Sequence, residues 1–461
     1  MAPSATESQS AATTGVNGTN GLSHIKKYKD RSNLVPVASR LKDGRALAED
    51  VWSIFNAANL PADCINLGQG YMNFPPPIWV REAAEQALAV TATNHYSHPK
   101  GRPRLREAIK KVYSPQFGRE LDVETEIQVT SGANEGMSRA TGQYSVFTAF
   151  LEPGDEVIMF EPFFDQYLPS VAFNGGVPVY VPLHPKLTGD KPTSNDWVID
   201  FDELARSITP RTKMIIVNTP HNPVGKVFTR EELEKIAALA EQHNLIVMSD
   251  EVEGVQYDFL VFDNKEHVRI ATLPGMWDRT VTVGSAGKLF SATGWRVGWL
   301  IGPPSIIRPT LAACTRIVFC SNSPLQEATA VGLEQMEERG YLPQAVKEYD
   351  ERRLTLTAAF DKLGMTYSHP EGTYFVLLDI STVKWPENYP FPASVQGRGR
   401  DFRACWFIAM EVGVSTIPVS EFYCEEHCSI GENYARFAFC KDVDTLQRAA
   451  ERLQGLRRFL Q

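Results

Sequence analysis

The sequence predicts an α/β protein, in which a large domain holds a mainly parallel seven-stranded sheet between helices and a smaller α+β domain follows. Seven short β-branched runs recur between residues 126 and 301, and most are nearly continuous apolar runs, as is typical of strands buried on both faces. Several intervals between these runs are long enough for a helix. This alternation of strands and helices indicates parallel pairing.

The expected strands and the clearest helix of the large domain can be placed along the chain. The strands cover residues 126–131, 156–161, 177–183, 213–218, 245–249, 280–284 and 297–301. The helix covers 229–244, where Thr229 and Glu232 form a capping box and Asn244 supplies a C-terminal cap. Its apolar face consists of Leu233, Ile236, Ala237 and Ala240.

Beyond about residue 330 the pattern indicates the second, smaller domain. A helical stretch around 326–363 precedes a strand at 373–379, and the Pro-rich segment 384–398 is interpreted as a loop. A final helix begins near Asp442. Its inward face consists of Leu446, Ala449, Ala450, Leu453, Leu456 and Leu460.

Composition excludes several classes of protein. Lys and Arg number 46 and Asp and Glu 55, a net charge of −9, which gives no support to a dedicated nucleic-acid binder. No apolar run approaches the roughly 18–20 residues that span a bilayer, so we expect no membrane association. Residues 1–24 are rich in Ala, Ser, Thr, Gly and Asn and lack the features of a signal or transit peptide. We therefore expect a disordered tail and a cytoplasmic location.

The cysteines predict neither disulfides nor a metal site. They stand at positions 64, 314, 320, 405, 424, 428 and 440. An odd number with loose spacing is typical of reduced thiols. Cys424, His427 and Cys428 form the one metal-like cluster in the sequence, but no second ligand pair follows at zinc-site spacing, and structural zinc normally takes four ligands. We expect no metal.

The densest chemical signal lies at residues 284–298, GSAGKLFSATGWRVG. Lys288 follows a strand and stands among small residues and hydroxyls, including Ser285. A lysine amine in a tight, partly desolvated pocket is what Schiff-base chemistry requires. Arg296 lies eight residues on and could clamp a phosphate through its planar fork. The alternative is a Gly/Ser loop that carries two surface cations.

Two further strand ends support the first interpretation. The run 215–227 ends in a polar turn with Asn222, and the run 245–252 places Asp250 at the end of a strand. Ligands of open α/β sheets bind outside the carboxyl ends of strands, so Asn222, Asp250 and Lys288 are expected to converge. A carboxylate there would keep a pyridine nitrogen protonated. Taken alone, Asp250 is better interpreted as a helix N-cap after a strand.

Blocks along nearly the whole chain resemble the fold-type-I, pyridoxal-phosphate-dependent aminotransferases, most closely the branch of kynurenine aminotransferases and cysteine-S-conjugate β-lyases. The resemblance covers roughly residues 48–460. The blocks that carry it are 65–77 (INLGQGYMNFPPP), 94–103 (NHYSHPKGRP), 129–136 (VTSGANEG), 158–167 (IMFEPFFDQY), 218–228 (NTPHNPVGKVF), 284–299, 370–376 (PEGTYFV) and 436–442 (RFAFCKD).

This resemblance implies a division of the chain. Residues 1–30 would form the disordered tail and 31–85 an N-terminal arm with part of the small domain. The large domain, which binds pyridoxal phosphate, would cover 86–330, and the small C-terminal domain 331–461. The resemblance further implies cis peptide bonds at Glu161–Pro162 and Asn222–Pro223.

The resemblance also implies which residues bind the cofactor. Lys288 would hold pyridoxal phosphate covalently and move the proton at the substrate Cα. Asp250 would pair with the pyridine nitrogen and Asn222 with the phenolic oxygen, while Phe164 would stack on the ring. The phosphate would be bound by Ala133, Asn134, Ser285 and Arg296, with a helix N-terminus suited to an anion.

Other residues are implied for substrate and partner. Arg436 would bind the substrate α-carboxylate as a bidentate pair beside the Gly70 backbone, with Asn222 nearby. Trp52 and Tyr71 would lie near the substrate side chain. Tyr96 would reach the phosphate of the partner subunit, which requires a homodimer. Judged singly, Trp52 and Phe164 are better interpreted as ordinary packing residues.

One position departs from the family. The residue three after the pyridine-binding aspartate is usually a tyrosine, whereas this chain has Glu253, and Tyr257 lies four residues later. A second carboxylate near the phenolic oxygen would raise the local proton affinity and weaken the hold on the cofactor. The change could mark a specialised or altered activity.

Three functions are compatible with these features. The first is transfer of the amino group of an aromatic-type L-amino acid, such as kynurenine, tryptophan or phenylalanine, to a 2-oxo acid. The second is carbon–sulfur β-lysis of cysteine conjugates with the same lysine. The third is a non-catalytic regulator, which usually needs an attached DNA-binding module that residues 1–47 are too short and polar to provide.

Overall fold

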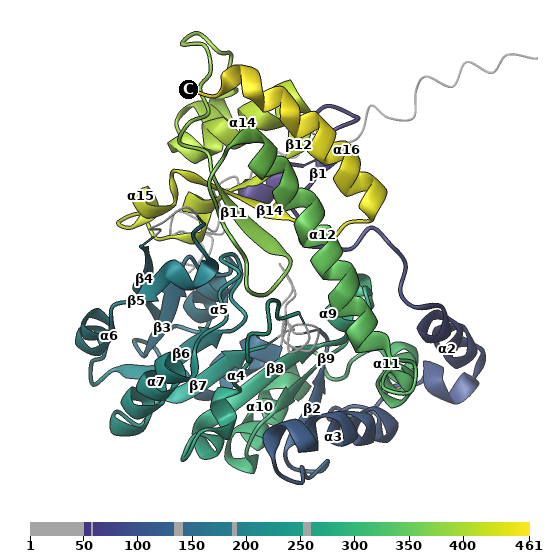
Figure 1. Cartoon of the computed structure of the whole chain (residues 1–461). Coiled ribbons are helices and arrows are strands. Elements are labelled where there is room, and N and C mark those ends of the chain that lie inside the picture. The colour runs from purple at the N-terminus through teal and green to yellow at the C-terminus, as the bar shows by residue number, and fades with distance from the viewer. Residues whose placement is uncertain (1–49, 57–58, 133–141, 187–190, 252–259) are drawn as a thin grey trace, which may run out of the picture. The chain divides into compact units, whose positions relative to one another are not determined.

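The computed structural model describes residues 50–56, 59–132, 142–186, 191–251 and 260–461 (Figure 1). Residues 48–461 form one compact unit by their internal contacts. The expected tail, residues 1–30, lies outside the described residues. In the part of the chain that is described, no helix has both the length and the apolar character needed to cross a membrane.

One large sheet dominates the N-terminal two thirds of this unit, in the strand order β2-β9-β8-β7-β6-β3-β4-β5. Its strands are β2 (Ile127–Thr130), β3 (Glu156–Glu161), β4 (Val177–Pro185), β5 (Trp197–Ile199), β6 (Thr212–Asn218), β7 (Ile246–Asp250), β8 (Thr280–Ser285) and β9 (Gly298–Ile301). The central pairings, from β4 through β3, β6 and β7 to β8, are parallel, and β9 is antiparallel to both of its neighbours.

All seven expected strands are present, so the expectation of a mainly parallel sheet is confirmed, but the count of seven is one short. The eighth strand, β5, is a three-residue antiparallel edge strand against the end of β4. So short a run has no periodicity that distinguishes it from a turn. It is held in place by burial of Trp197, whose indole N–H donates to the Ser368 hydroxyl at 3.2 Å.

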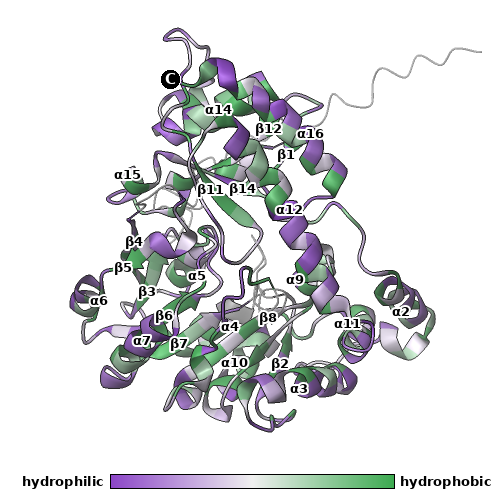
Figure 2. Cartoon of the chain, viewed as in Figure 1, coloured by the Kyte–Doolittle hydropathy of each residue, from purple (hydrophilic) through white to green (hydrophobic). Residues whose placement is uncertain are grey.

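The continuous apolar character of the strands follows from burial on both faces. Ile158 and Ile215 belong to one hydrophobic cluster, whereas their neighbours Val157 and Ile216 belong to another. Successive side chains of a strand point to opposite faces, so each face of the sheet has its own core. Figure 2 shows the strands in the colour of hydrophobic residues, with mixed colouring on the surrounding helices.

Helices surround this sheet and form much of the smaller domain. They are α1 (Val51–Ile54), α2 (Ile78–Ala89), α3 (Pro103–Phe117), α4 (Gly142–Phe150), α5 (Tyr167–Phe173), α6 (Phe201–Ser207), α7 (Arg230–Gln242), α9 (Ala286–Leu289), α10 (Pro304–Ile317), α11 (Ser323–Gln335), α12 (Tyr341–Leu363), α13 (Ala393–Gln396), α14 (Arg400–Val412), α15 (Cys428–Gly431) and α16 (Val443–Leu453).

The capping box expected for α7 is present. The Thr229 hydroxyl accepts from the Glu232 N–H, and the Glu232 carboxylate accepts from the Thr229 N–H. The four expected apolar residues are the buried ones of this helix. Asn244 has a φ of 52°, the left-handed conformation that ends a helix. Local chemistry therefore determined both ends of α7.

The smaller domain contains a four-stranded sheet in the order β10-β11-β14-β13. Its strands are β10 (Tyr367–Ser368), β11 (Phe375–Asp379), β13 (Ile417–Pro418) and β14 (Tyr434–Ala438), all paired antiparallel. A separate parallel pair joins β1 (Ile65–Asn66) to β12 (Val414–Ser415), so the N-terminal segment packs with the C-terminal domain.

The helical stretch expected at 326–363 divides into α11 and α12. The break occurs where Gly340, at a φ of 57°, adopts a left-handed conformation that glycine tolerates best. The loop expected at 384–398 includes the one-turn helix α13. The final helix α16 begins after Asp442, whose carboxylate caps it by accepting from the Thr445 N–H.

Candidate active site

A pocket of about 210 Å³ lies where β6 and β8 end at their carboxyl edge. It is lined by Trp52, Gly70, Tyr71, Phe164, Asn222, Ser285, Gly287, Lys288, Thr293, Arg296, Phe375 and Arg436. Nine of these are residues that the sequence predicts for the site. They come from segments more than 380 residues apart in the chain, and the ends of parallel strands bring them together.

Lys288 is positioned by the one-turn helix α9, which follows β8 directly. Its Nζ donates to the Gly70 carbonyl at 3.0 Å and to the Tyr374 hydroxyl at 2.6 Å. A Cβ on Gly287 would stand 3.0 Å from the Thr293 Cα, so glycine permits this close return of the chain. The amine is therefore oriented before any ligand binds.

Arg436, on β14, is buried at the other end of the pocket. One guanidinium nitrogen donates to the Asn222 side-chain oxygen at 3.1 Å, and another donates to the Gly68 carbonyl at 2.8 Å. The guanidinium lies over the rings of Phe375 (4.3 Å) and Phe422 (4.8 Å). These contacts fix the plane of the fork, which is the geometry that suits a carboxylate.

An anion cradle forms around Arg296. A Cβ on Gly132 would meet an Arg296 guanidinium nitrogen at 2.5 Å, so any side chain there would displace the end of Arg296. Gly132 has a φ of +88° and Arg296 one of 54°, both left-handed. Ser285 and Thr293 line the same pocket. Ala133 and Asn134, predicted to complete the phosphate site, lie outside the described residues.

Asp250, the last residue of β7, is buried beneath the pocket rather than lining it. The Tyr167 hydroxyl donates to its carboxylate, and the Asn218 side chain donates to its backbone carbonyl at 3.0 Å. Asn218 in turn accepts from the Asn222 N–H at 2.7 Å. One chain of hydrogen bonds thus joins Asp250 to the residue that contacts Arg436.

Aromatic side chains form the walls of the pocket: Trp52, Tyr71, Phe164 and Phe375. The Trp52 indole N–H donates to the Asp165 carboxylate at 2.6 Å. Burial raises the pKa of Asp165, and the bond from Trp52 and the charge of Arg436 oppose that rise. Trp52 is therefore more than a packing residue, because it also supplies the polar partner of a buried acid.

The remaining predicted residues lie elsewhere. Tyr96 is 86% exposed and packs edge-to-face on Phe319, away from the pocket of its own chain. Glu253 and Tyr257, where the sequence departs from the family, lie outside the described residues. Both expected cis peptide bonds are present, and Thr219–Pro220 is a third.

Several residues of the site were not singled out from the sequence. Tyr374, Tyr167 and Gly132 all lie inside blocks that carry the family resemblance, but no spacing rule links them to Lys288, Asp250 or Arg296. Lys441 was missed as well. It is buried, and its Nζ donates to the carbonyls of Gln69 and Tyr71.

An oriented lysine amine, a buried carboxylate and an anion cradle at the carboxyl edge of a parallel sheet define an enzyme of fold type I that uses pyridoxal phosphate. The comparisons agree. The family model for class I and II aminotransferases matches residues 62–453. The chain belongs to the class I and II aminotransferases and is a pyridoxal-phosphate-dependent transaminase.

Named relatives support this assignment. The chain is 44% identical over 426 residues to the "Probable kynurenine–oxoglutarate transaminase BNA3" of Saccharomyces cerevisiae, covering 90% of this chain and 93% of the relative. It is 41% identical to the kynurenine–oxoglutarate transaminase of Dictyostelium discoideum, covering 90% and 96%. The crystal structure of Bna3p from Saccharomyces cerevisiae superposes with a TM-score of 0.86 at 43% identity, covering 92% of this chain and all of that one.

The described residues fit pyridoxal phosphate. The cradle that excludes a Cβ at Gly132 leaves room for a phosphate beside Arg296 and Ser285. Asp250 provides an acidic group for a pyridine nitrogen, and Lys288 provides the amine. These residues therefore match the three polar parts of the cofactor: the phosphate, the ring nitrogen and the aldehyde.

Proposed function

We propose that this transaminase takes the amino group of an aromatic-type L-amino acid, kynurenine in the first place, and transfers it to a 2-oxo acid such as 2-oxoglutarate. The observation that carries the substrate class is the set of aromatic walls beside the Arg436 fork. The names of the relatives point the same way. An aromatic side chain gains from offset or edge-to-face contact with such walls.

The proposed roles follow from the contacts. When bound, pyridoxal phosphate supplies an electron sink for the breaking Cα–H bond. Nζ of Lys288, oriented by Gly70 and Tyr374, removes the proton from Cα of the substrate. Asp250, held by Tyr167, would pair with the ring nitrogen, and Asn222 would bond the phenolic oxygen.

The remaining groups bind and orient. Arg296 and Ser285, with Ala133 and Asn134, would hold the phosphate, and Phe164 would stack on the ring. Arg436 would grip the α-carboxylate with its two outer nitrogens, beside the Gly70 backbone and Asn222. The amino acid would then present Cα to Lys288 and its side chain to Trp52 and Tyr71.

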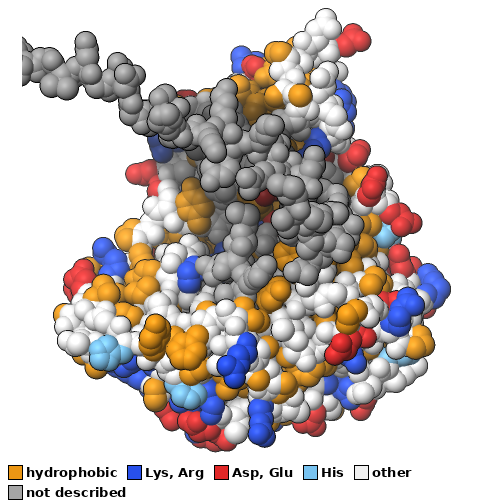
Figure 3. Space-filling model, turned by 180° about the vertical axis from the view of Figure 1, so that it is seen from behind, with side chains coloured by type: hydrophobic (Ala, Val, Ile, Leu, Met, Phe, Trp, Pro, Cys, Tyr) orange, Lys and Arg blue, Asp and Glu red, His pale blue; other side chains and the backbone are white. Residues whose placement is uncertain are grey.

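We further propose a homodimer and a cytoplasmic location. Support for the dimer comes from Tyr96, which is exposed, does not line the pocket of its own chain and has its ring against exposed Phe319. Figure 3 shows hydrophobic side chains among the charged ones on the face opposite that of Figure 1. Tyr96 would reach the phosphate in the partner's pocket.

A donor panel tests the proposed substrate class. The holoenzyme is incubated with single L-amino acids and 2-oxoglutarate, and products are identified by mass spectrometry. We expect kynurenine, tryptophan and phenylalanine to give glutamate and the matching 2-oxo acids, and Lys288→Ala to lose essentially all turnover. Preference for acidic or small aliphatic donors would refute the aromatic class. Thiol and pyruvate from cysteine conjugates, without glutamate, would indicate a β-lyase instead.

A further inference from the structure

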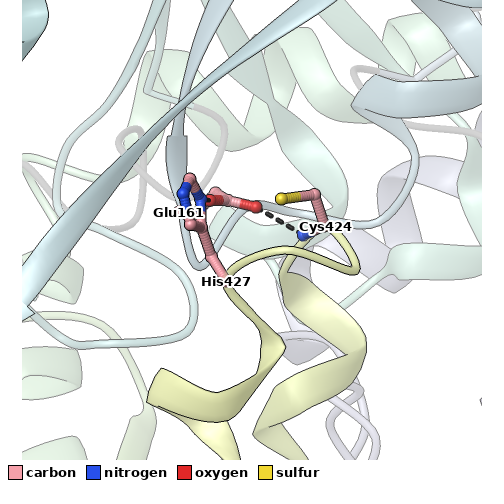
Figure 4. Close-up of side chains that lie close together, drawn as sticks. All are labelled: Glu161, Cys424 and His427. Atoms are coloured by element: carbon pink, nitrogen blue, oxygen red, sulfur yellow. Dashed lines mark hydrogen bonds and ion pairs between the residues drawn. The ribbon is translucent and has the colours of Figure 1, made fainter.

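A second cluster of reactive side chains lies outside the pocket. Glu161 is the last residue of β3, and Cys424 and His427 stand in the segment before α15 (Figure 4). Their carboxylate oxygen, sulfur and imidazole nitrogen atoms all lie within 4.8 Å of one another. The sequence shows only Cys424 and His427 of this cluster. The fold supplies Glu161 from 263 residues earlier than Cys424.

The three groups are locked together by hydrogen bonds. One oxygen of Glu161 accepts from the Cys424 backbone N–H, and the other is paired with Nδ1 of His427. The Glu161 side chain is fully buried. The fold thus brings a carboxylate, a thiol and an imidazole together at one point.

We propose that Glu161, Cys424 and His427 bind one Zn²⁺ ion. Carboxylate, thiolate and imidazole are all zinc ligands, and three protein ligands with a water in the fourth position make a tetrahedral site. The His427 side chain is 23% exposed while Glu161 is fully covered. An ion can therefore enter at the imidazole and reach the carboxylate behind it.

Binding exchanges protons for the metal. The thiol proton of Cys424 leaves as its sulfur coordinates. His427 coordinates through Nδ1 in the tautomer that carries its proton on Nε2, so its contact with Glu161 opens and the carboxylate turns to the ion. No electron is transferred. Zinc affinity should therefore fall as the pH is lowered, and binding should release protons to the buffer.

The ion would join two parts of the molecule that meet beside the substrate pocket. Directly after Glu161 and Pro162, the Phe163 N–H donates to the Phe422 carbonyl at 2.8 Å. Phe422 also packs against the guanidinium of Arg436. A metal bridge from Glu161 to Cys424 would hold this junction closed and stabilise the folded protein without contacting the substrate or the cofactor.

The test measures binding and stability rather than turnover, so its result does not depend on the proposed substrate. Chelator-treated full-length holoenzyme is titrated with Zn²⁺ against a chromophoric chelator. We expect one ion per chain, a rise in melting temperature, and at least about tenfold weaker binding in Cys424→Ser and in His427→Gln. Cys428→Ser is the matched control, a thiol of the same segment outside the cluster, and should bind like the wild type.

Cobalt(II) provides a second readout that does not rely on stability. Bound at this site, it should show tetrahedral bands in the red part of the visible spectrum and a thiolate charge-transfer band that Cys424→Ser removes. The proposal is overturned if the Cys424 and His427 variants bind zinc as tightly as the wild type, if Cys428→Ser loses binding instead, or if cobalt shows neither band.

Discussion

At the scale of single residues, the site is organised by cations around one short backbone loop. The Gly68 carbonyl accepts from Arg436, the Gly70 carbonyl from Lys288, and the Gln69 and Tyr71 carbonyls from Lys441. Burial lowers the pKa of Lys441, and the nearby Lys288 charge acts in the same direction. The carbonyl oxygens of this loop thus fix the positions of three cationic side chains, Arg436, Lys288 and Lys441.

Arg436 is expected to anchor the substrate carboxylate. Arg436→Ala should lower kcat/KM by an amount equivalent to about 2–5 kcal/mol of lost transition-state stabilisation, because one member of a buried charged pair is lost. Cofactor retention should stay nearly unchanged. Arg436→Lys keeps the positive charge but not the planar guanidinium, so its kcat/KM should lie between those of the wild type and Arg436→Ala. Steady-state kinetics and cofactor absorbance measure both quantities. An alanine variant that loses cofactor while keeping its affinity for the amino donor would show that the residue is misassigned.

Tyr167 is expected to act through Asp250. Tyr167→Phe removes one charge-assisted hydrogen bond to the carboxylate, worth about 1.5–3 kcal/mol. The dissociation constant of pyridoxal phosphate should rise by roughly tenfold or more, with little change in the KM for the amino donor. Equilibrium dialysis of the cofactor measures the first effect. Tyr180→Phe, a ring stacked on Phe163, is a control that should leave cofactor affinity intact.

At the scale of elements, strand ends and their following turns carry the chemistry. The turn between β6 and α7 contains Asn222 and also the buried His221, whose backbone N–H donates to the Lys226 carbonyl at 2.7 Å. Burial, aided by the charge of Lys226, lowers the pKa of His221 to about 3. This turn therefore needs a neutral imidazole to stay folded beside the pocket.

The lowered pKa of His221 predicts a sign for the dependence of stability on pH. The unfolded chain binds a proton at His221 below about pH 6.5 while the folded chain does not until about pH 3, so protonation of this group opposes folding below pH 6.5 and has no effect above it. As the pH falls from about 6.5 toward 3, this group lowers the free energy of unfolding by about 1.4 kcal/mol per pH unit. Urea unfolding near pH 7 and near pH 5 should show a smaller loss for His221→Phe than for the wild type. Parallel losses in both proteins would show that His221 is already protonated when folded.

At the scale of the whole molecule, both the large sheet and the small domain contribute residues to the site. Lys288, Asn222 and Arg296 come from the region of the large sheet, and Arg436 and Phe375 from the small one. Neither part alone contains both the Lys288 amine and the Arg436 guanidinium. The site consequently depends on how the two parts pack, and that packing includes the β1–β12 pair at the N-terminal segment.

The proposed dimer adds a third contributor and can be tested by mixing subunits. Lys288→Ala and Tyr96→Ala homodimers should each be impaired. Coexpressed, they should form heterodimers in which one site has Lys288 from one chain and Tyr96 from the other. Because half of a random mixture is heterodimer and one of its two sites is intact, roughly a quarter of wild-type activity should return. Activity no greater than that of the Tyr96→Ala protein alone would mean that Tyr96 serves its own chain or none.

Much of the fold was predictable because its signals are local. Burial on both faces made β3 and β8 continuous apolar runs, and the Thr229–Glu232 capping box marked the start of α7. Lys288 and Arg296 stand eight residues apart in one Gly-rich segment, so one turn of chain brings both to the pocket. Such features depend on neighbours within a few residues, which the sequence displays directly.

The tertiary structure decided the partners of these residues. Tyr374 reaches Lys288 across 86 residues, Tyr167 reaches Asp250 across 83, and Glu161 meets His427 across 266. Edge strand β5 also exists only because Trp197 is buried against a distant segment. Helical and strand periodicity determines which face of an element is buried, but which distant side chain it meets there depends on the packing of several elements at once.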